Sequence, residues 1–406
     1  MSPGSALILV ENLSVPFDRR VWQESLALRR AGLDVVVVCP QGTKRDQAPL
    51  EVLEGVEIHR YPLTAATGGP LGYLREYGTA LWRTHRLARR LARTHSFDVV
   101  HACNPPDVLL LTVLSLRRRG SRFLFDHHDL VPELFLSRFG GRPGALYRLT
   151  LALEWLTFRL AHVVVSTNES YRHVALTRGG KRPEDVFVVR SAPDLERFRP
   201  TEPDPELRSG KQHLLGYLGV MGPQDGVDHA LRSLAVLRER RDDWHAIFVG
   251  DGDVRPRMEQ LALELGLGEL VEFTGRVDDA TVARVLSSCD VCLAPDPKNP
   301  LNDVSTMNKI VEYMAMSRPV VSYDLVEARV SAGPAAVYAQ ANDERSFAAC
   351  IDELLDDPAR RAEMGRVGRS RVEENLSWET SEQALLAAYG RALAPGRAAA
   401  PAPASV

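Results

Sequence analysis

The 406-residue sequence predicts an α/β protein with two doubly wound parallel sheets, and three observations support this. Short apolar runs alternate with longer amphipathic stretches, which is the pattern of βαβ units. A proline-rich segment interrupts the pattern near residue 195, and the pattern then begins again. Domains usually hold about 100–200 residues, so a chain of this length is expected to form two cores.

Composition and hydropathy exclude several classes of protein. Hydrophobic residues make up 45% of the chain and charged residues 25%, which excludes a disordered, collagen-like or coiled-coil protein. The longest apolar run, 108–116, is about half the length that a bilayer requires, so no transmembrane helix is expected. No basic residue precedes the apolar run 6–10, so we expect no secretory signal. Five scattered cysteines are typical of a reducing compartment, and the cytoplasm is expected.

The first domain is predicted to span residues 1–195. A helix is expected at 19–31, because Asp18 can cap its start and Gly32 can adopt the positive φ that ends it. This helix would follow the first strand, as the first crossover of a doubly wound fold does. Buried strands are expected at 7–10, 35–39, 99–101, 123–125 and 163–166.

A linker and a second domain are predicted to follow. Four prolines within 191–205 exclude a regular helix or an internal strand. The second domain is expected over 211–376, a final helix over 377–393 that packs back across the junction, and a disordered Ala/Pro-rich tail over 394–406. Strands are expected at 214–218, 246–249, 271–274, 291–294 and 319–323, and helices at 228–240, 254–266, 279–288, 307–317 and 344–356.

Charge is distributed unevenly along the chain. Residues 1–200 hold 28 basic and 20 acidic side chains, whereas the remainder holds 22 and 33. A basic first half fits an anionic surface such as phospholipid headgroups, and chance asymmetry on solvated surfaces explains it equally well. The segment 82–93 carries five arginines beside Leu87, Ala88 and Leu91. It is predicted either to bury its leucines on the sheet or to lie on an anionic membrane.

The first candidate site is the run Asp126, His127, His128 and Asp129, which follows a predicted strand. Ligands of doubly wound sheets bind beyond the carboxyl ends of the strands. A histidine there lies at the ligand, and a flanking carboxylate can fix its tautomer. The run therefore indicates a reactive or binding site, although a histidine pair is often structural.

The second candidate site lies at the start of a predicted helix. Ser305 and Thr306 are plausible N-caps, so the helix is expected to begin near residue 306. Its free amides and Lys309 would attract a diphosphate, and Glu312 could accept hydrogen bonds from a ribose diol. The alternative is an ordinary surface pair of Lys309 and Glu312 at i,i+3.

A set of motifs in a fixed order supplies further context. They include FDHHDLVPE, YLGVMGPQDGVD, FVGDGD, CDVCLAP and NKIVEYMAMSRPVVSYD. With these motifs the chain resembles glycosyltransferase family 4, the retaining, metal-independent nucleotide-sugar enzymes, over nearly its whole length. The resemblance implies the GT-B fold, in which two Rossmann-like domains face each other across a cleft.

The resemblance also implies roles for individual residues. His128, with Asp129 beside it, would contact the transferred sugar, Lys309 would lie near the donor phosphates, and Glu312 would bind the ribose hydroxyls. The residues implied for donor binding are Gly219, Gly222, Gly250, Gly252, Arg276, Val277, Asp303, Val304, Ser305, Thr306, Asn308, Lys309 and Glu312. Candidates on the acceptor side are Arg19, Arg20, His101 and His127. No metal ligand is implied.

Three features depart from the family pattern. Val304 stands where the first glutamate of an E-x7-E signature is usual, with Asp303 beside it. Val220 and Asp225 stand where a basic pair usually grips the diphosphate, and the loop 14–20 contains no glycine. The groups expected to hold the diphosphate instead are the helix amides, Lys309, and Arg19 or Arg20.

The expected activity is transfer of a sugar from a nucleoside-diphosphate sugar, with UDP as the nucleotide, to a hydroxyl acceptor. The anomeric configuration would be retained, and the product would be a polysaccharide, glycolipid or glycosylated metabolite. No cofactor is expected: Asp251 and Asp253 spell D-x-D but match a nucleotide loop, and Cys289 and Cys292 are interpreted as the entry into a buried strand rather than as zinc ligands.

The sequence leaves two other functions open and disfavours a third. A nucleotide-sugar epimerase of the same architecture would need mobile protons, for which Asp126, Asp129 and Glu133 are candidates. A non-catalytic nucleotide-sugar-binding protein would fit the missing glutamate and basic pair. A dinucleotide-dependent oxidoreductase is disfavoured, because no G-x-G-x-x-G follows the first strand.

Overall fold

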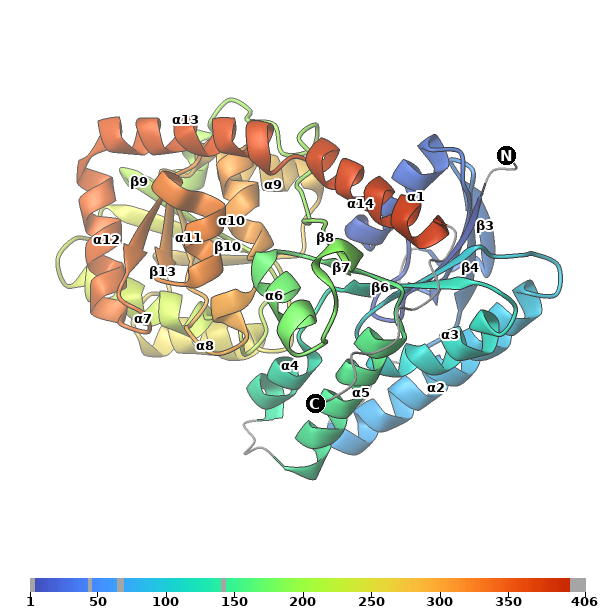
Figure 1. Ribbon diagram of the computed structural model, residues 1–406. Helices are drawn as coiled ribbons and strands as arrows, with labels where there is room; N and C mark the ends of the chain where they lie inside the picture. The colour runs from blue at the N-terminus through green and yellow to red at the C-terminus, as the bar shows by residue number, and fades with distance from the viewer. Residues whose placement is uncertain (1–3, 43–45, 64–68, 140–143, 395–406) are drawn as a thin grey trace, which may run out of the picture. The chain divides into compact units, whose positions relative to one another are not determined.

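The computed structural model describes residues 4–42, 46–63, 69–139 and 144–394, and the predicted tail at 394–406 lies almost entirely outside them. The chain divides into two units (Figure 1). The first unit comprises Met1–Pro132, Pro143–Val189 and Glu382–Val406, and the second comprises Glu133–Arg142 and Arg190–Ser381. The second segment of the first unit ends at Val189, before the predicted boundary at 195. The last segment of the first unit begins at Glu382.

The first unit contains an eight-stranded sheet in the order β3-β4-β2-β1-β5-β6-β7-β8. Every neighbouring pair is parallel except β3 and β4. The five predicted strands are present, whereas β3, β4 and β8 were not predicted; β3 is a partly exposed edge strand and β8 has only three residues. The strands are β1 (Ser5–Leu9), β2 (Asp34–Pro40), β3 (Leu50–Leu53), β4 (Val56–Tyr61), β5 (Val99–Cys103), β6 (Arg122–His127), β7 (Val163–Ser166) and β8 (Val186–Val188).

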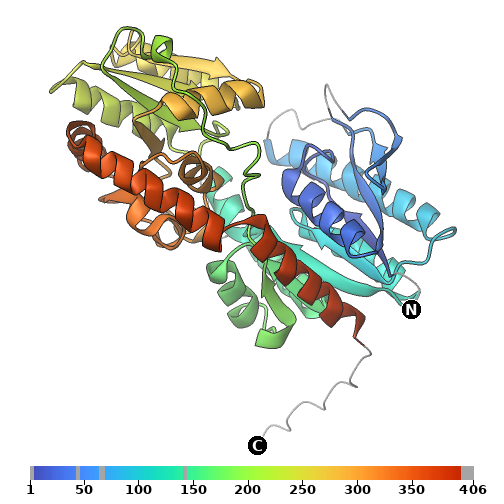
Figure 2. The same cartoon turned by 90° about the horizontal axis from the view of Figure 1, so that it is seen from above.

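The helices of the first unit pack on both faces of this sheet. Helix α1 begins as predicted: the Asp18 side chain accepts a hydrogen bond from the Val21 amide at 3.1 Å, and Gly32 follows the helix with φ +88°. Helices α1 and α14 run along the same side of the sheet (Figures 1 and 2), and Arg30 of α1 pairs with Glu382 of α14 at 2.7 Å. The helices of this unit are α1 (Arg19–Arg30), α2 (Gly69–Leu91), α3 (Leu110–Arg117), α5 (Ala145–Leu160), α6 (Glu169–Thr177) and most of α14 (Trp378–Leu393). Helix α4 (Val131–Phe139) belongs to the second unit from Glu133 onward.

Side chains of the first sheet point alternately to its two faces, and each face packs against a different set of helices. Val100, Phe123 and Phe125 belong to an apolar core that includes Ala88 of α2 and Phe158 of α5. Because successive strand residues point to opposite faces, the residues between them face α1 and α14. The polar cluster described below lies on that side.

The second unit contains a six-stranded parallel sheet in the order β11-β10-β9-β12-β13-β14. All five predicted strands and all five predicted helices are present; β14, α11 and α13 were not predicted. The elements are β9 (His213–Leu218), α7 (Val227–Arg238), β10 (Trp244–Val249), α8 (Arg255–Glu264), β11 (Val271–Gly275), α9 (Asp279–Ser288), β12 (Val291–Ala294), α10 (Asn308–Ala315), β13 (Val320–Tyr323), α11 (Val326–Ala332), β14 (Ala336–Ala339), α12 (Glu344–Asp356) and α13 (Pro358–Asn375).

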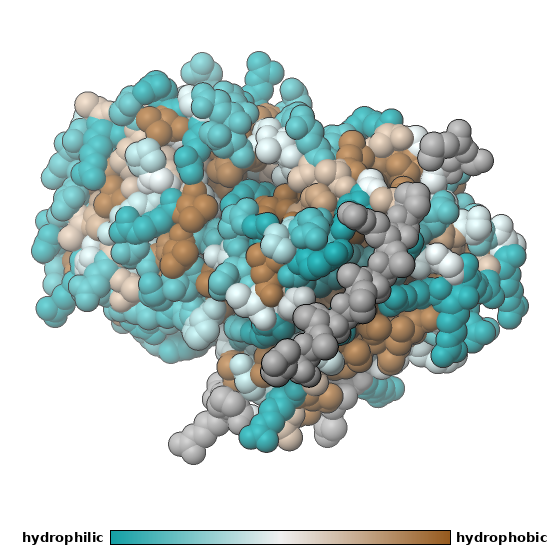
Figure 3. Space-filling model, in the orientation of Figure 1, coloured by the Kyte–Doolittle hydropathy of each residue, from teal (hydrophilic) through white to brown (hydrophobic). Residues whose placement is uncertain are grey.

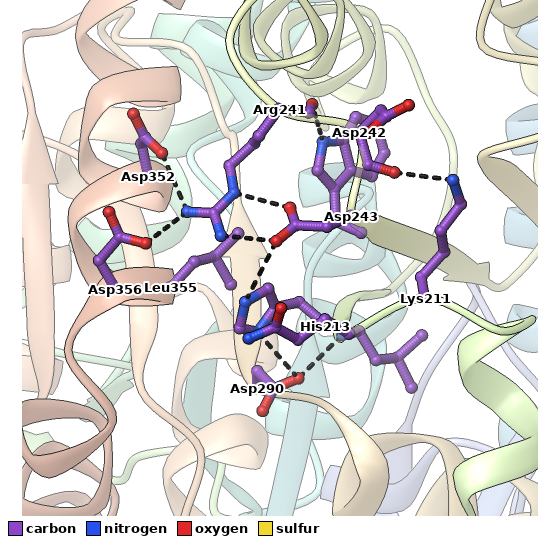
Figure 4. Close-up of polar contacts among 12 residues, drawn as sticks. Lys211, His213, Arg241, Asp242, Asp243, Asp290, Asp352, Leu355 and Asp356 are labelled. Atoms are coloured by element: carbon purple, nitrogen blue, oxygen red, sulfur yellow. Dashed lines mark hydrogen bonds and ion pairs between the residues drawn. The ribbon is translucent and has the colours of Figure 1, made fainter.

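Charged side chains tie the amino ends of the second sheet's strands to helix α12 (Figure 4). Arg241 forms two hydrogen bonds with Asp243, at 2.7 and 2.8 Å, immediately before β10. The same guanidinium reaches Asp352 at 3.1 Å and Asp356 at 2.7 Å on α12. The side chain of His213 lies beside Asp243, with its Nε2 3.8 Å from a carboxylate oxygen. This network is structural, since it lies at the edge of the sheet opposite to the carboxyl ends.

No helix among the described residues is both long and apolar enough to cross a bilayer. All five cysteines are free thiols. Cys289 and Cys292 are fully buried beside Gly216, where a Cβ atom would lie 2.5 Å from the Cys289 sulfur. The pair therefore fills space in the core of the second unit, with Cys289 at the end of α9 and Cys292 in β12, so it lies at the entry to a buried strand as predicted.

Candidate functional site

The first cluster forms where β6 ends. Asp126 is fully buried, and its Oδ2 lies 2.5 Å from Nε2 of His128. Arg20 of α1 donates a hydrogen bond to the other carboxylate oxygen at 2.9 Å. Burial opposes ionisation of Asp126, but Arg20 and His128 outweigh it and hold the pKa of this carboxyl well below its usual value. Asp126 is therefore an anion that fixes the ring of His128, whose side chain is 16% exposed.

An asparagine that the sequence analysis missed holds the backbone of this site. Asn104 follows β5, the strand next to β6. Its side-chain oxygen accepts hydrogen bonds from the amides of His128 at 2.7 Å and Asp129 at 3.2 Å, and its amide group donates to the Asp129 carbonyl at 2.8 Å. A polar residue directly after a buried strand is the signal that could have identified it.

A buried relay connects the same cluster to the last helix. His101 of β5 is fully buried, with Nε2 3.3 Å from Asp126 Oδ2 and Nδ1 3.0 Å from the Tyr389 hydroxyl of α14. Burial lowers the pKa of His101. Glu24 of α1 lies 3.2 Å from Arg20, and burial together with Asp126 raises its pKa well above the ordinary value. Tyr389, His101, Asp126 and His128 thus form one continuous chain of polar contacts.

The structure corrects three of the four acceptor-side predictions. His101 is fully buried in the relay, and Arg20 is 8% exposed and bound to Asp126, so neither is presented to an acceptor. His127 is also fully buried, packed against Phe158 and other aromatic rings, and burial lowers its pKa to about 3. Strand alternation is the reason, because it turns His127 to the face opposite Asp126. Only Arg19 of the four has an exposed side chain.

The cluster also contains groups that ligate metals in other proteins. Among the described residues, two trios bring three ligand atoms together, His101–Cys103–Asp126 and Glu24–Asp126–His128. Both trios share Asp126. The Arg20 guanidinium already supplies positive charge 2.9 Å from that carboxylate, which disfavours a divalent cation at the same place.

The second cluster forms at the carboxyl edge of the second sheet, where the loops after β9 and β10 touch. A Cβ atom at Gly250 would lie 1.8 Å from the carbonyl oxygen of Gly219, and one at Gly252 would lie 2.4 Å from that of Met221. The amide of Gly222 donates to the Asp225 carboxylate at 2.9 Å. These glycines therefore let two loop backbones approach more closely than any side chain would allow.

Lys309 lies in the first turn of α10, beneath these loops. Its ammonium is 2.6 Å from Asp296 Oδ1, 3.8 Å from Asp225 Oδ1 and 5.1 Å from the centre of the Tyr217 ring. Burial opposes its charge, but Asp296 and the other neighbours outweigh burial and raise the pKa of Lys309. Asp296 was not predicted, although it lies two residues after the end of β12; it is 1% exposed, and its second oxygen has no hydrogen-bond partner among the described residues.

The helix that carries Lys309 begins two residues later than predicted. It starts at Asn308, whose side chain is exposed, and its N-cap is Met307, which makes no side-chain cap. Ser305 Oγ donates instead to the Leu301 carbonyl at 2.7 Å, so Ser305 does not cap α10. Glu312 is half-buried one turn after Lys309.

The remaining predicted donor residues border this cluster or lie apart from it. Asp303 accepts a hydrogen bond from the first amide of α11 at 3.0 Å and lies 3.3 Å from the Lys298 ammonium, so its carboxylate is already engaged. Val304 and Thr306 are half-buried in the connection to α10. Arg276 is exposed and Val277 half-buried directly after β11.

Two family models match the chain, on either side of the proline-rich linker. Residues 18–197 match the model described as Glycosyltransferase Family 4, and residues 212–357 match Glycosyl transferases group 1. Together the two matches cover most of the sequence. This chain belongs to the family 4 glycosyltransferases. Asp126 and His128 lie within the first matched segment, and Lys309 and Asp296 lie within the second.

Relatives of this glycosyltransferase match almost its whole length. It is 25% identical to glycogen synthase of Mycobacterium tuberculosis over 401 residues, which cover 91% of this chain and 90% of that protein. Its fold is similar to sucrose-phosphate synthase from Thermosynechococcus elongatus, with a TM-score of 0.78, 19% identity and coverage of 96% and 98%. A structure of Anabaena HepE in complex with UDP-glucose gives a TM-score of 0.70, 17% identity and coverage of 95% and 99%. The fold is GT-B, with two Rossmann-like α/β units.

Proposed function

We propose that this glycosyltransferase moves a sugar from a UDP-sugar to a hydroxyl acceptor with retention of anomeric configuration. The observation that carries the proposal is the meeting of two glycine-bearing loops with the first turn of α10, which holds a buried, charged Lys309. Such a helix start is suited to a diphosphate, because its amides and dipole favour negative charge. The similarity to a protein crystallised with UDP-glucose supports UDP as the nucleotide.

The donor half of the reaction needs a group that stabilises the departing diphosphate. Negative charge grows on this group as the glycosidic bond breaks, and fixed positive groups lower the barrier most when they face that charge. Lys309 and the α10 amides are the proposed groups. Lys309 is already paired with Asp296, so the diphosphate competes with a carboxylate for the same ammonium. Glu312 is proposed to bind the ribose hydroxyls.

The sugar half of the reaction is assigned to the first cluster. His128 is proposed to contact the transferred sugar, held by Asp126 through its ring and by Asn104 through its backbone. The leaving phosphate is proposed to take the proton of the acceptor hydroxyl on the face where the bond forms. No protein nucleophile is then required.

Catalysis without a metal ion is part of the proposal. Lys309 and the α10 amides would supply the positive charge that a divalent cation provides in other transferases. The expected result is that transfer proceeds at the same rate with EDTA and with added Mg²⁺. A rate that EDTA abolishes and Mg²⁺ restores would contradict this, and would direct attention to Asp225 and Asp296 beside Lys309.

A non-catalytic role in binding nucleotide sugars is the second candidate. Asp225 and Asp296 both face the only lysine of the α10 turn, which weakens its attraction for a diphosphate. Such a protein would bind UDP-sugars without releasing UDP. An epimerase is less favoured, because Asp126 is fully buried and bound to Arg20, so it cannot easily move protons to and from a substrate.

The acceptor and the location complete the proposal. A hydroxyl of a polysaccharide, glycolipid or metabolite is the proposed acceptor class. We place the enzyme in the cytoplasm, where five free cysteines stay reduced, with peripheral contact to the inner face of the membrane through the first unit.

The decisive experiment measures nucleotide release from a panel of UDP-, GDP- and ADP-sugars, with thermal shift as the binding assay. A donor at about 100 times its Kd should add roughly 2.7 kcal/mol to the free energy of unfolding. His128→Ala is expected to lower kcat about 100-fold or more, and Glu312→Ala to raise the donor KM. Binding without release would establish the second candidate. Wild-type rates in both variants, with circular dichroism showing intact folds, would refute the site assignment.

A further inference from the structure

We propose that the outer surface of helices α2, α3 and α5 binds the headgroup region of an anionic lipid bilayer. The inference gives a defined surface to the membrane contact proposed above and rests on that part of the proposal. It does not depend on the transfer reaction, so the two can fail separately.

Helix α5 presents an apolar stripe to solvent. Leu149 is 52% exposed and Trp155 50% exposed, and Leu146 and Leu156 belong to the same stripe. On the helix, Leu149 and Leu156 lie side by side, Leu146 and Trp155 lie on the two edges of the exposed half, and Phe158 lies opposite the leucine pair and is fully buried in the core. Brown side chains gather over the region of α3 and α5 in Figure 3. This stripe is an amphipathic helix face turned outward.

The neighbouring helices extend the apolar stripe. Leu111 of α3 is 51% exposed and Trp82 of α2 is 58% exposed. Arg117 at the end of α3 donates a hydrogen bond to the Leu160 carbonyl at the end of α5, which joins these two helices. All three helices cover the same face of the sheet, because each contributes residues to one apolar core. An exposed apolar surface shared by adjacent helices marks an interaction site rather than scattered surface leucines.

Charge identifies the partner as anionic. The three helices hold eight arginines and two glutamates. One of these glutamates, Glu154, is fully buried and bound to Arg178, so it adds no exposed negative charge. The exposed Arg148 and Arg159 lie between Trp155 and the leucine pair on α5, and Arg86 stacks on Trp82 with its guanidinium 5.5 Å from the ring centre. Exposed arginines around leucine and tryptophan are typical of helices that lie in the lipid headgroup region.

Exposed leucines together with exposed arginines argue against a second copy of this chain or a nucleic acid as the partner. A second copy of this chain would bring like-charged arginines together across the interface, which opposes pairing through this face. Nucleic acid is also anionic, but its phosphates do not cover an aliphatic stripe of leucines. A bilayer satisfies both features, since headgroups meet the arginines and acyl chains meet the leucines. Tryptophan also favours the boundary between them.

The proposed lipid-binding surface begins at the carboxyl edge of the first sheet. Helix α5 leads directly into β7, so it runs against the strand direction and begins at the carboxyl edge of the sheet. Leu146 and Leu149 belong to its first turns, at the edge where β6 ends and His128 follows. Docking through α5 would therefore bring the carboxyl edge of this sheet toward the lipid surface.

The test is co-sedimentation with vesicles of phosphatidylcholine alone and of phosphatidylcholine with phosphatidylglycerol. Wild-type protein is expected to pellet only with the anionic vesicles, and less at high salt. The double variant Leu149→Ser/Trp155→Ser should bind about tenfold more weakly, because it removes apolar area that the lipid covers. Brominated lipids should quench wild-type fluorescence more than that of the single variant Trp155→Phe.

A matched control uses apolar side chains that are equally exposed in the second unit. Leu263→Ser/Val330→Ser removes residues that are 63% and 41% exposed and should bind vesicles like the wild type. Equal binding by the α5 variant and the wild type, or equal binding to both vesicle types, would overturn the proposal. So would a dimer or an RNA complex that the α5 variant abolishes. Nucleotide release without an acceptor should stay unchanged in the α5 variant, which separates a failed docking surface from a failed transferase.

Discussion

Three consecutive residues at the end of β6 have three different environments. Asp126 is a buried anion, His127 is sealed among aromatic rings, and His128 is held at the edge of the cluster. The direction of each side chain along the strand explains this division, because alternate residues face opposite interiors. The chemistry of a histidine pair therefore depends on which face each ring occupies.

His127 should make the first unit sensitive to acid. Its folded pKa is lowered to about 3 from 6.5, so below pH 6.5 the unfolded chain binds more protons and unfolding becomes easier. This group alone should remove about 1.4 kcal/mol of stability per pH unit over that range. His127→Phe should be less sensitive to acid in urea titrations between pH 7.5 and 5. The exposed His173→Gln should follow the wild type, and parallel curves for all three proteins would disprove the assignment.

Tyr389 is predicted to be a positioning residue that acts through His101. Tyr389→Phe removes the hydroxyl 3.0 Å from His101 Nδ1 and should cost about 1–3 kcal/mol of stability. Because the relay reaches His128 through Asp126, we expect kcat to fall and its pH profile to shift while the donor KM stays constant. A loss of stability with an unchanged kcat and pH profile would mean that Tyr389 has only a structural role.

At the scale of elements, the loops of the second sheet determine the donor site. Strands β9 and β10 are neighbours in the sheet, so the loops that follow their carboxyl ends are in contact from their first residues. The Gly219 amide donates to the Val249 carbonyl at 3.0 Å, and the Met221 amide donates to the Asp251 carbonyl at 3.0 Å. The loop backbones are thus bonded to each other, which fixes the surface against which α10 presents Lys309.

Gly250→Ala should disrupt this arrangement. Gly250 has φ +136°, and an added Cβ would lie 1.8 Å from the Gly219 carbonyl oxygen, so we expect a loss of about 3 kcal/mol and of donor affinity. The control is Gly78→Ala in α2, where a Cβ meets open space and should stabilise the helix by about 1 kcal/mol. Thermal unfolding and UDP titration measure both effects. Wild-type UDP affinity in Gly250→Ala would contradict the role of this loop.

At the scale of the molecule, each unit is assembled from separated segments. The end of the chain from Glu382 belongs to the first unit, where α14 contributes the Tyr389 hydroxyl to a buried relay. Arg391 on the same helix pairs with Asp185 at 2.8 Å. The last helix is therefore part of the first unit's core, although some 190 residues of the second unit precede it.

Ending the chain at Ser381 should destabilise the first unit selectively. The cut removes Tyr389 and Arg391 and exposes His101 with the neighbouring core, whereas the second unit keeps its internal contacts. Hydrogen exchange should show lost protection in β1, β5 and β6 and unchanged protection in β9 and β10. Equal loss in both sheets, or loss in neither, would contradict this division of the chain.

Local sequence patterns were enough to predict two mainly parallel sheets, the proline-rich break between them and the family. Apolar runs of four to six residues between amphipathic stretches are local patterns, and so are the strand ends that place Asp126 and Lys309 at carboxyl edges. Weak local signals were missed: β8 has three residues, β3 is a partly exposed edge, and Met307 replaces the predicted caps of α10.

Which polar groups act together depends on contacts between segments that are distant along the chain or lie on different elements. Asn104, Asp296 and Tyr389 contact His128, Lys309 and His101, which lie on or next to other elements, and position after a strand marks a residue as polar at an edge without naming its partner. The tertiary structure also decided that His101 and His127 are buried and that Leu149 and Trp155 are not. The physical reason is the same in each case: spacing along the chain sets the face of a strand or helix, but burial depends on what other segments cover that face.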